Sequence, residues 1–80
     1  MGELSIRQQQ VYNFIYSYNH KNGISPCVAD IANGLGLSKS TIVVHANAIK
    51  KKGFISWRER IPRSFVIIKH IADKPARRTK

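Results

Sequence analysis

Apolar residues recur at helical spacing in three successive stretches of the first 50 residues, with one histidine among them. The three stripes are Val11, Phe14, Ile15 and Tyr18, then Val28, Ile31, Ala32 and Leu35, and finally Ile42, His45, Ala46 and Ile49. Positions i, i+3, i+4 and i+7 line one side of an amphipathic helix. The pattern therefore predicts three short helices, at about residues 6–20, 28–35 and 39–52.

Residues that favour helix ends flank each stripe. Ser5 and Gln8 have the spacing of a capping box, in which each side chain accepts a hydrogen bond from the other residue's backbone N–H. Ser38 is a favourable N-cap for the third helix. Cys27 is a poor N-cap for the second helix, although Asp30 supplies an acidic partner three residues later. Glycine suits the left-handed conformation that ends a helix. The glycines that follow the stripes are Gly23, Gly36 and Gly53.

The third predicted helix carries two adjacent valines, Val43 and Val44, which cannot both face a core. At about 100° per residue, Ile42 and Ala46 share the inner side and Val44 points away from them. The outer side carries Ser40, Val44, Asn47 and Lys51, with Thr41 and Val43 on its flanks. The competing interpretation is that one valine packs beneath a neighbouring element or in a dimer contact.

After Gly53 the apolar period changes from helical to alternating. Ile55 and Trp57 alternate with polar residues, and residues 65–68 form the β-rich run Phe-Val-Ile-Ile. The segment between them, residues 59–63, reads Glu-Arg-Ile-Pro-Arg and is typical of a hairpin loop. We therefore expect an α+β fold, a winged helix-turn-helix in which three helices precede a β-hairpin wing.

The chain is 80 residues long, which fits a single small domain over residues 1–71 and a basic, disordered tail over residues 72–80. Its single Cys27 cannot form an intramolecular disulfide and fits a cytoplasmic protein. No signal peptide or membrane-length apolar run is present. His20, His45 and His70 have no metal-site spacing, so we expect no metal and no cofactor.

Positive charge is concentrated in the second part of the chain. Residues 1–48 hold three basic residues and two acids, whereas residues 49–80 hold eleven basic residues and two acids. Such polarity favours a polyanionic partner, nucleic acid first and an anionic membrane surface second. The alternative is a solubilising tail, but much of the excess precedes residue 72.

The turn over residues 34–38, Gly-Leu-Gly-Leu-Ser, joins two short helices as in a helix-turn-helix. The outer side of the third helix would then enter the major groove of double-stranded DNA, and a basic hairpin beside it would follow the phosphates. We expect no enzymatic activity and no small-molecule substrate, because four isolated acids and no nucleophile–base pair leave nothing to perform chemistry.

The sequence also resembles the N-terminal DNA-binding domain of LexA-type repressors from Leu4 to about Ile68. The motifs that carry the resemblance are Leu4-Ser5-x-Arg7-Gln8-Gln9, Gly23-x-x-Pro26, Asp30-Ile31-Ala32, Leu35-Gly36-Leu37-Ser38, Lys52-Gly53-Phe54-Ile55 and Pro62-Arg63. Three features depart from the family pattern. Cys27 replaces a Ser or Thr cap, the turn before the third helix is one residue shorter, and the sequence contains no peptidase domain. An isolated domain and a small stand-alone regulator both fit.

The resemblance places base-reading residues on the first half of the third helix. These residues are Ser38, Ser40, Thr41, Val43 and Val44, and Asn47 one turn later could pair with adenine. Serine and threonine hydroxyls bond to several bases, while a valine can pack against the 5-methyl group of thymine. The predicted phosphate contacts are Arg58, Arg60 and Arg63 at the wing, Lys39 and Lys51 on the third helix, and Arg7 and Gln8 at the start of the first helix.

The remaining candidates have structural interpretations. His45 is expected to be packed rather than a ligand or base, Trp57 to cover the core rather than stack on a base, and Tyr12 and Tyr16 to pack. Lys21, Lys50, Lys69 and Lys74 are expected on a solvated surface. The leading function is a transcriptional repressor on an inverted-repeat operator, with a weak or DNA-induced homodimer. The alternative is a winged-helix adaptor that binds protein without sequence-specific DNA binding.

Overall fold

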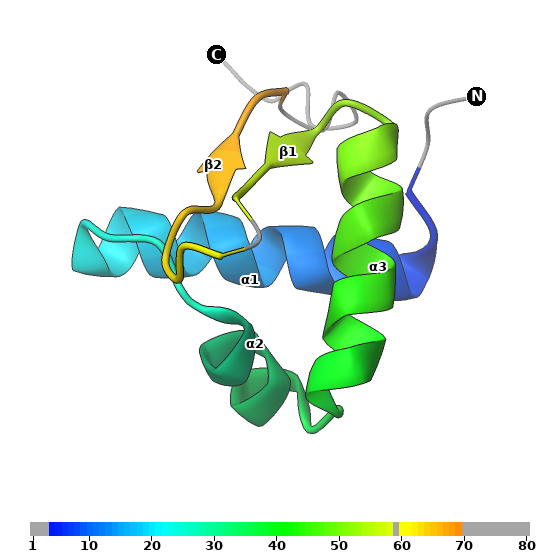
Figure 1. The fold of residues 1–80 in the computed structure, drawn as a ribbon, viewed down its shortest axis with the longest axis horizontal. Coiled ribbons are helices and arrows are strands. Elements are labelled where there is room, and N and C mark those ends of the chain that lie inside the picture. The colour runs from blue at the N-terminus through cyan, green and yellow to red at the C-terminus, as the bar shows by residue number, and fades with distance from the viewer. Residues whose placement is uncertain (1–3, 59, 70–80) are drawn as a thin grey trace, which may run out of the picture.

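The computed structural model describes residues 4–58 and 60–69, in which three helices precede a two-stranded antiparallel sheet (Figure 1). The elements are α1 (Ile6–Asn22), α2 (Val28–Leu35), α3 (Lys39–Lys51), β1 (Ile55–Ser56) and β2 (Val66–Ile67). The predicted winged helix-turn-helix architecture is therefore confirmed. α1 runs two residues past its predicted end, because the helix continues up to its C-cap, Gly23. The predicted tail, residues 72–80, lies outside the described residues.

The predicted helix caps form. The Ser5 hydroxyl accepts the N–H of Gln8 at 3.1 Å, and Gln8 Oε1 accepts the N–H of Ser5 at 3.0 Å. The Asp30 carboxylate accepts the N–H of Cys27 at 3.2 Å and so assists the weak cap of α2. The glycines after the helices have positive φ, 74° at Gly23, 70° at Gly36 and 85° at Gly53. These local signals explain why the sequence predicts the helix limits well.

The three helices pack around one core that the hairpin covers at one end. Val11, Ile15, Ile31, Ile42 and Ile49 are completely buried, as the stripes predict. His45 is half-buried, in keeping with a packed position. From the hairpin side the core is completed by Phe54, Ile55, Trp57 and Phe65. The Trp57 and Phe65 ring centroids lie 5.2 Å apart, which confirms Trp57 as core cover.

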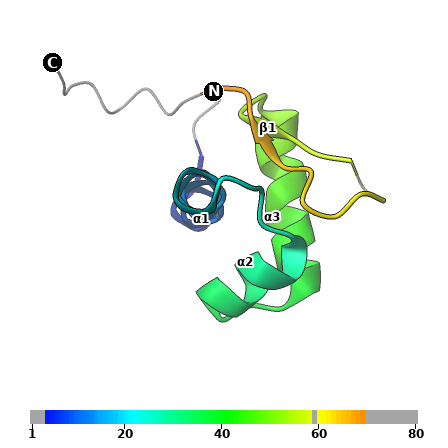
Figure 2. The same ribbon diagram turned by 90° about the vertical axis from the view of Figure 1, so that its left-hand side faces the viewer.

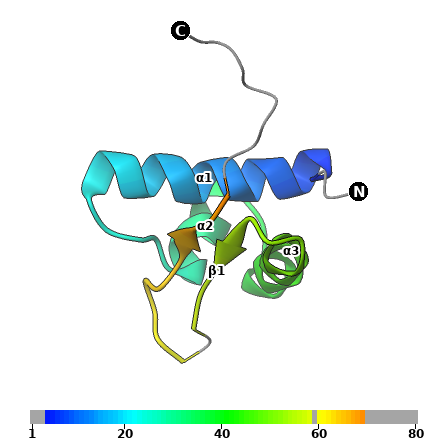
Figure 3. The same cartoon turned by 90° about the horizontal axis from the view of Figure 1, so that it is seen from above.

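α3 and the hairpin loop lie on the same side of α1. Figure 1 shows α3 crossing α1, with α2 at the lower end of α3 and the hairpin at the upper end. Viewed along α1 in Figure 2 and from above in Figure 3, α3 and the loop both project away from α1. At its end the hairpin returns to α1, where the Tyr12 hydroxyl donates a hydrogen bond to the Lys69 carbonyl at 3.0 Å. The side opposite α1 is therefore formed by one helix and one loop.

Candidate nucleic-acid interface

The outer side of α3 presents the side chains that the sequence predicts to face away from the core. Val44 is 65% exposed and Val43 is 39% exposed, whereas Ile42 on the inner side is completely buried. Ser40, Asn47 and Lys51 are also exposed. The prediction that Val44 points away from the interior is confirmed. Val43 and Val44 are flanked by polar side chains, and their exposed surface contributes little to the core of the protein.

The first turn of α3 uses the Ser38 hydroxyl as its cap. Ser38 Oγ accepts the N–H of Thr41 at 3.2 Å and donates to Thr41 Oγ1 at 2.9 Å. The proton of Ser38 is therefore directed to Thr41, while Thr41 keeps its own hydroxyl proton as a donor. Thr41 is half-buried on the flank of the outer side. Of these two predicted base-reading residues, it is therefore Thr41 whose hydroxyl proton is available to donate to a base.

The hairpin is short, and a serine closes its loop. Only Ile55 with Ile67 and Ser56 with Val66 pair as strands among the described residues. Beyond them, Ser64 Oγ accepts the N–H of Arg58 at 2.8 Å and donates to the Arg58 carbonyl at 3.1 Å. Arg58 and Arg60 are exposed on this loop. A side chain therefore replaces the next backbone pair and keeps the two sides of the loop together.

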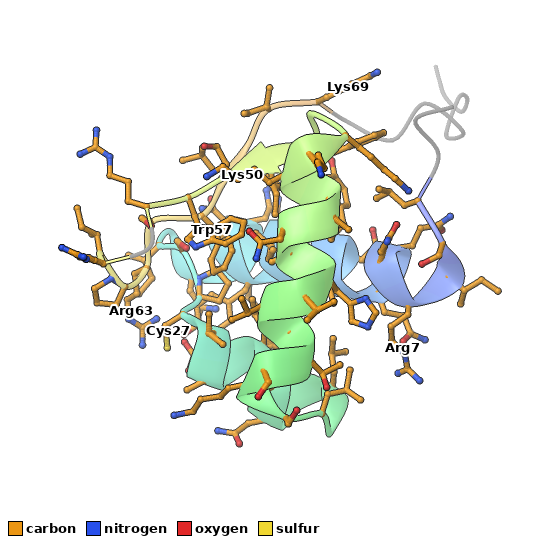
Figure 4. The ribbon with its side chains drawn as sticks, turned by 45° about the vertical axis from the view of Figure 1, so that its right-hand side comes forward. Arg7, Cys27, Lys50, Trp57, Arg63 and Lys69 are labelled. Atoms are coloured by element: carbon orange, nitrogen blue, oxygen red, sulfur yellow. The ribbon has the colours of Figure 1, made fainter. Side chains whose placement is uncertain are left out.

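Arg63 is placed differently from the other two arginines of the loop. Its backbone has φ 59°, a left-handed conformation that is uncommon for a non-glycine residue. Its Nη1 atom lies 2.9 Å from Asp30 Oδ2, 3.1 Å from the Ser25 carbonyl and 3.3 Å from the Tyr18 hydroxyl. Figure 4 shows Arg63 beside Cys27, at the start of α2. The contact of Arg63 with a phosphate stays a prediction. The contacts seen in the structure bind its guanidinium to the helical body.

A groove of about 290 Å³ separates the hairpin loop from the start of α2. Its cationic lining residues are Lys39, Arg58, Arg60 and Arg63. Its apolar lining includes Val28, Trp57 and Ile61. The structure thus brings four of the predicted phosphate-binding residues together on one side of α3.

The predicted residues at the start of α1 lie on the other side of α3. Figure 4 shows Arg7 and Arg63 on opposite sides of this helix. Arg7 Nη1 donates to Gln10 Oε1 at 3.1 Å, and Gln8 Oε1 accepts from Lys52 Nζ at 3.0 Å. The sequence did not predict that Lys52 lies beside Gln8 at the start of α1, because 44 residues separate the two. Cationic groups therefore lie on both sides of α3.

Two lysines that were expected to be simply solvated contact aromatic rings. Lys50 Nζ lies 4.9 Å from the centroid of the Trp57 ring and donates to the Trp57 carbonyl at 3.3 Å. Lys69 Nζ lies 5.1 Å from the centroid of the Phe54 ring. Both contacts add a cation–π interaction over the hairpin side of the core. Lys21 is exposed as expected, and Lys74 lies outside the described residues.

The contacts of Asp30 with Cys27 and Arg63 favour the ionised form of its carboxyl group. The pKa of Asp30 lies below its ordinary value, chiefly because the backbone N–H of Cys27 donates to the carboxylate. The positive charge of Arg63 and the Tyr18 hydroxyl lower this pKa further, while desolvation acts in the opposite direction. Asp30 therefore stays ionised and paired with Arg63 at neutral pH.

Neither a metal centre nor a membrane-spanning helix is found among the described residues. Within residues 4–58 and 60–69, no three His, Cys, Asp or Glu side chains lie close enough together to hold a metal ion. None of the described helices is long and apolar enough to cross a membrane.

Comparison with known proteins identifies the family. Residues 1–64 match the family described as the LexA DNA binding domain. The chain is 39% identical over 69 residues to the LexA repressor of Thermosipho africanus, which covers 86% of the chain and 35% of that protein. It is 35% identical over 74 residues to the LexA repressor of Thermotoga maritima, covering 92% of the chain and 38% of that protein.

A third relative, the LexA repressor of Staphylococcus carnosus, is 35% identical over 69 residues, or 85% of the chain and 33% of that protein. The chain thus spans roughly a third of the length of the curated relatives it matches. The match covers all three helices and the hairpin loop up to Ser64. By its sequence and its fold, this chain belongs to the LexA DNA-binding domain family.

Proposed function

We propose that the protein is a sequence-specific, double-stranded DNA-binding regulator that represses transcription by occupying an operator. The observation that carries this proposal is the outer side of α3, where exposed polar and valine side chains lie between two groups of cations. An α-helix with its side chains is about 10–12 Å wide and fits the major groove, which is about 12 Å wide. The similar proteins of known function are LexA repressors, which agrees with this function.

Base recognition is assigned to the exposed part of α3. Ser40, Thr41 and Asn47 offer hydroxyl and amide groups to base edges. Ser38 can donate to a base when its proton turns away from Thr41 Oγ1, and its oxygen can still accept the capping N–H of Thr41. Val43 and Val44 have no polar atoms, so their favourable contact in the major groove is the 5-methyl group of thymine. The bound sequence should therefore contain thymine opposite the valine pair.

Phosphate contacts are assigned to residues in three places, five of them cationic and one, Gln8, neutral. Arg58, Arg60 and Lys39 lie on the hairpin side, Arg7 and Gln8 lie at the start of α1, and Lys51 lies at the end of α3. The two strands of a duplex border the major groove, so cations on both sides of a helix in that groove can each meet one strand. About six phosphate contacts would give a slope of log affinity against log salt of roughly −5.

A single domain of this size has a modest footprint on DNA, so useful affinity calls for two copies on an inverted repeat. The two copies would pair weakly, or only when both are bound to DNA. Their location would be the cytoplasm, with the nucleoid.

Selection of bound sites from a random duplex pool tests the proposal. Recovered sites should share a half-site, the half-sites should be related by inversion, and binding should weaken steeply with salt. Competition of a labelled selected duplex against unlabelled random duplex gives the specificity ratio. Equal binding to every duplex, together with a salt slope near zero, would refute the proposal and point to the adaptor function.

A further inference from the structure

We infer that Arg63 is a positioning residue, which holds the hairpin loop against the helical body so that Arg58 and Arg60 can meet the phosphates. This inference rests on the proposed function of the loop. It assigns Arg63 a task different from that of the other two loop arginines, because its guanidinium binds Tyr18, Ser25 and Asp30 of the helical body.

The contacts of Arg63 join the loop to three separate segments. Tyr18 belongs to α1, Ser25 to the connection between α1 and α2, and Asp30 to the first turn of α2. These partners are 45, 38 and 33 residues from Arg63 along the chain. One guanidinium nitrogen therefore fixes the loop relative to both helices that support α3.

A second contact two residues later strengthens this attachment. The N–H of Phe65 donates to Ser25 Oγ at 3.0 Å, and the Ser25 hydroxyl donates to the Pro26 carbonyl at 2.8 Å. Ser25 is 7% exposed, so these hydrogen bonds are shielded from water. Positions 63 and 65 are thus both bound to Ser25, and Ser64 between them holds Arg58 on the opposite side of the loop. The attachment extends from the body to Arg58 through this series of contacts.

The backbone at position 63 supports the same conclusion. A left-handed conformation is unfavourable for an arginine and persists where the surroundings hold it in place. Here the conformation coincides with the ion pair to Asp30. That pair also makes Arg63 a poor phosphate ligand, because a phosphate at its Nη1 would lie close to the Asp30 carboxylate and be repelled by it.

A double-mutant cycle tests the inference on the full 80-residue chain. Arg63→Asn removes the guanidinium and tolerates a positive φ, and its effect is compared in the native chain and in an Arg58→Ala/Arg60→Ala background. Lys21→Asn is the matched control, since it removes one positive charge from an exposed position at the end of α1. The probe is a fluorescein-labelled duplex recovered by the selection, and affinity is measured across a range of salt concentrations.

If Arg63 positions the loop, Arg63→Asn weakens binding about tenfold in the native chain, with a loss of up to about 2 in the salt slope. The same change has no effect once Arg58 and Arg60 are absent. A direct phosphate contact would instead reduce the slope by about 1 in both backgrounds. An equal loss in both backgrounds, or no loss in the native chain, overturns the inference. An Arg58→Ala/Arg60→Ala chain that binds as tightly as the native chain overturns the role of the loop as well.

Asp30→Asn is a second variant, for which the loss of a negative charge and the release of Arg63 change the DNA affinity in opposite directions. It removes a negative charge, which by itself leaves DNA affinity unchanged or raises it, whereas release of Arg63 lowers it. Amide hydrogen exchange at Arg58 and Phe65, measured without DNA, should accelerate in both Asp30→Asn and Arg63→Asn. Unchanged exchange at these two amides would overturn the inference even if the chain binds DNA as proposed.

Discussion

Gly34 of α2 lies directly against the ring of Phe14 of α1, and a Cβ atom at position 34 would overlap Phe14 Cε2. The contact brings the two helices closer than any other residue at position 34 would allow. It therefore sets the position of α2, and through the turn that follows, the entry point of α3.

Gly34→Ala should destabilise the protein by about 1–3 kcal/mol, because the added methyl group must displace an aromatic ring within a packed interface. The midpoint of urea unfolding, followed by the fluorescence of Trp57, measures the effect. Asn33→Ala, at an exposed position of the same helix, is the control and should change stability by less than about 0.5 kcal/mol. If the added methyl group is the cause, Phe14→Leu in the Gly34→Ala chain should restore part of the loss.

Replacement of thymine by deoxyuridine opposite the valine pair should weaken binding about fourfold, which corresponds to one methyl group removed from water. In the Val44→Ala chain the same replacement should matter less, because the apolar partner is gone. Fluorescence anisotropy with the two duplexes gives the four affinities of this cycle. Val66→Ala changes an exposed valine on β2 and should leave the sensitivity to deoxyuridine intact. Equal sensitivity in the native and Val44→Ala chains would exclude the contact.

Lys39→Ala should weaken binding to all duplexes alike and reduce the salt slope by about 1, as expected of a phosphate contact. Lys39 is exposed at the first residue of α3 and lines the groove beside the hairpin loop. Lys21→Ala should leave the slope unchanged. A change in sequence preference without a change in the salt slope would mean that Lys39 contacts a base and not a phosphate.

Acid should destabilise the protein through Asp30. The pKa of this carboxyl is lowered in the folded protein from its ordinary 3.8, so the ionised form favours folding. That stabilisation is fully present above about pH 5 and is lost as the pH falls through 4 toward the lower folded value. Urea unfolding of native and Asp30→Asn chains between pH 7 and pH 3 tests this expectation. The variant should show a smaller decline, because the contribution of the Asp30 carboxyl is absent from it. Parallel declines would mean that Asp30 is not coupled to folding.

The helices and the outer side of α3 could be predicted because they depend on local patterns. Stripes, caps and the 100° step between residues lie within one or two helical turns of sequence. They located the three helices to within two residues and placed Val44 on the exposed side of α3. The contacts of Arg63 and of Lys52 could not be predicted in this way. Their partners lie 33 to 45 residues away, and no local motif marks a left-handed arginine.

The hydrogen bond from Tyr12 to the Lys69 carbonyl has a practical consequence for work with this protein. It brings the carboxyl end of the described chain onto the middle of α1, behind the helix that we propose to enter the groove. A fluorophore, an immobilisation handle or a second protein attached after this point would leave from the rear of the molecule. Such attachments should not obstruct the duplex, which makes this end the suitable one for surface-based measurements.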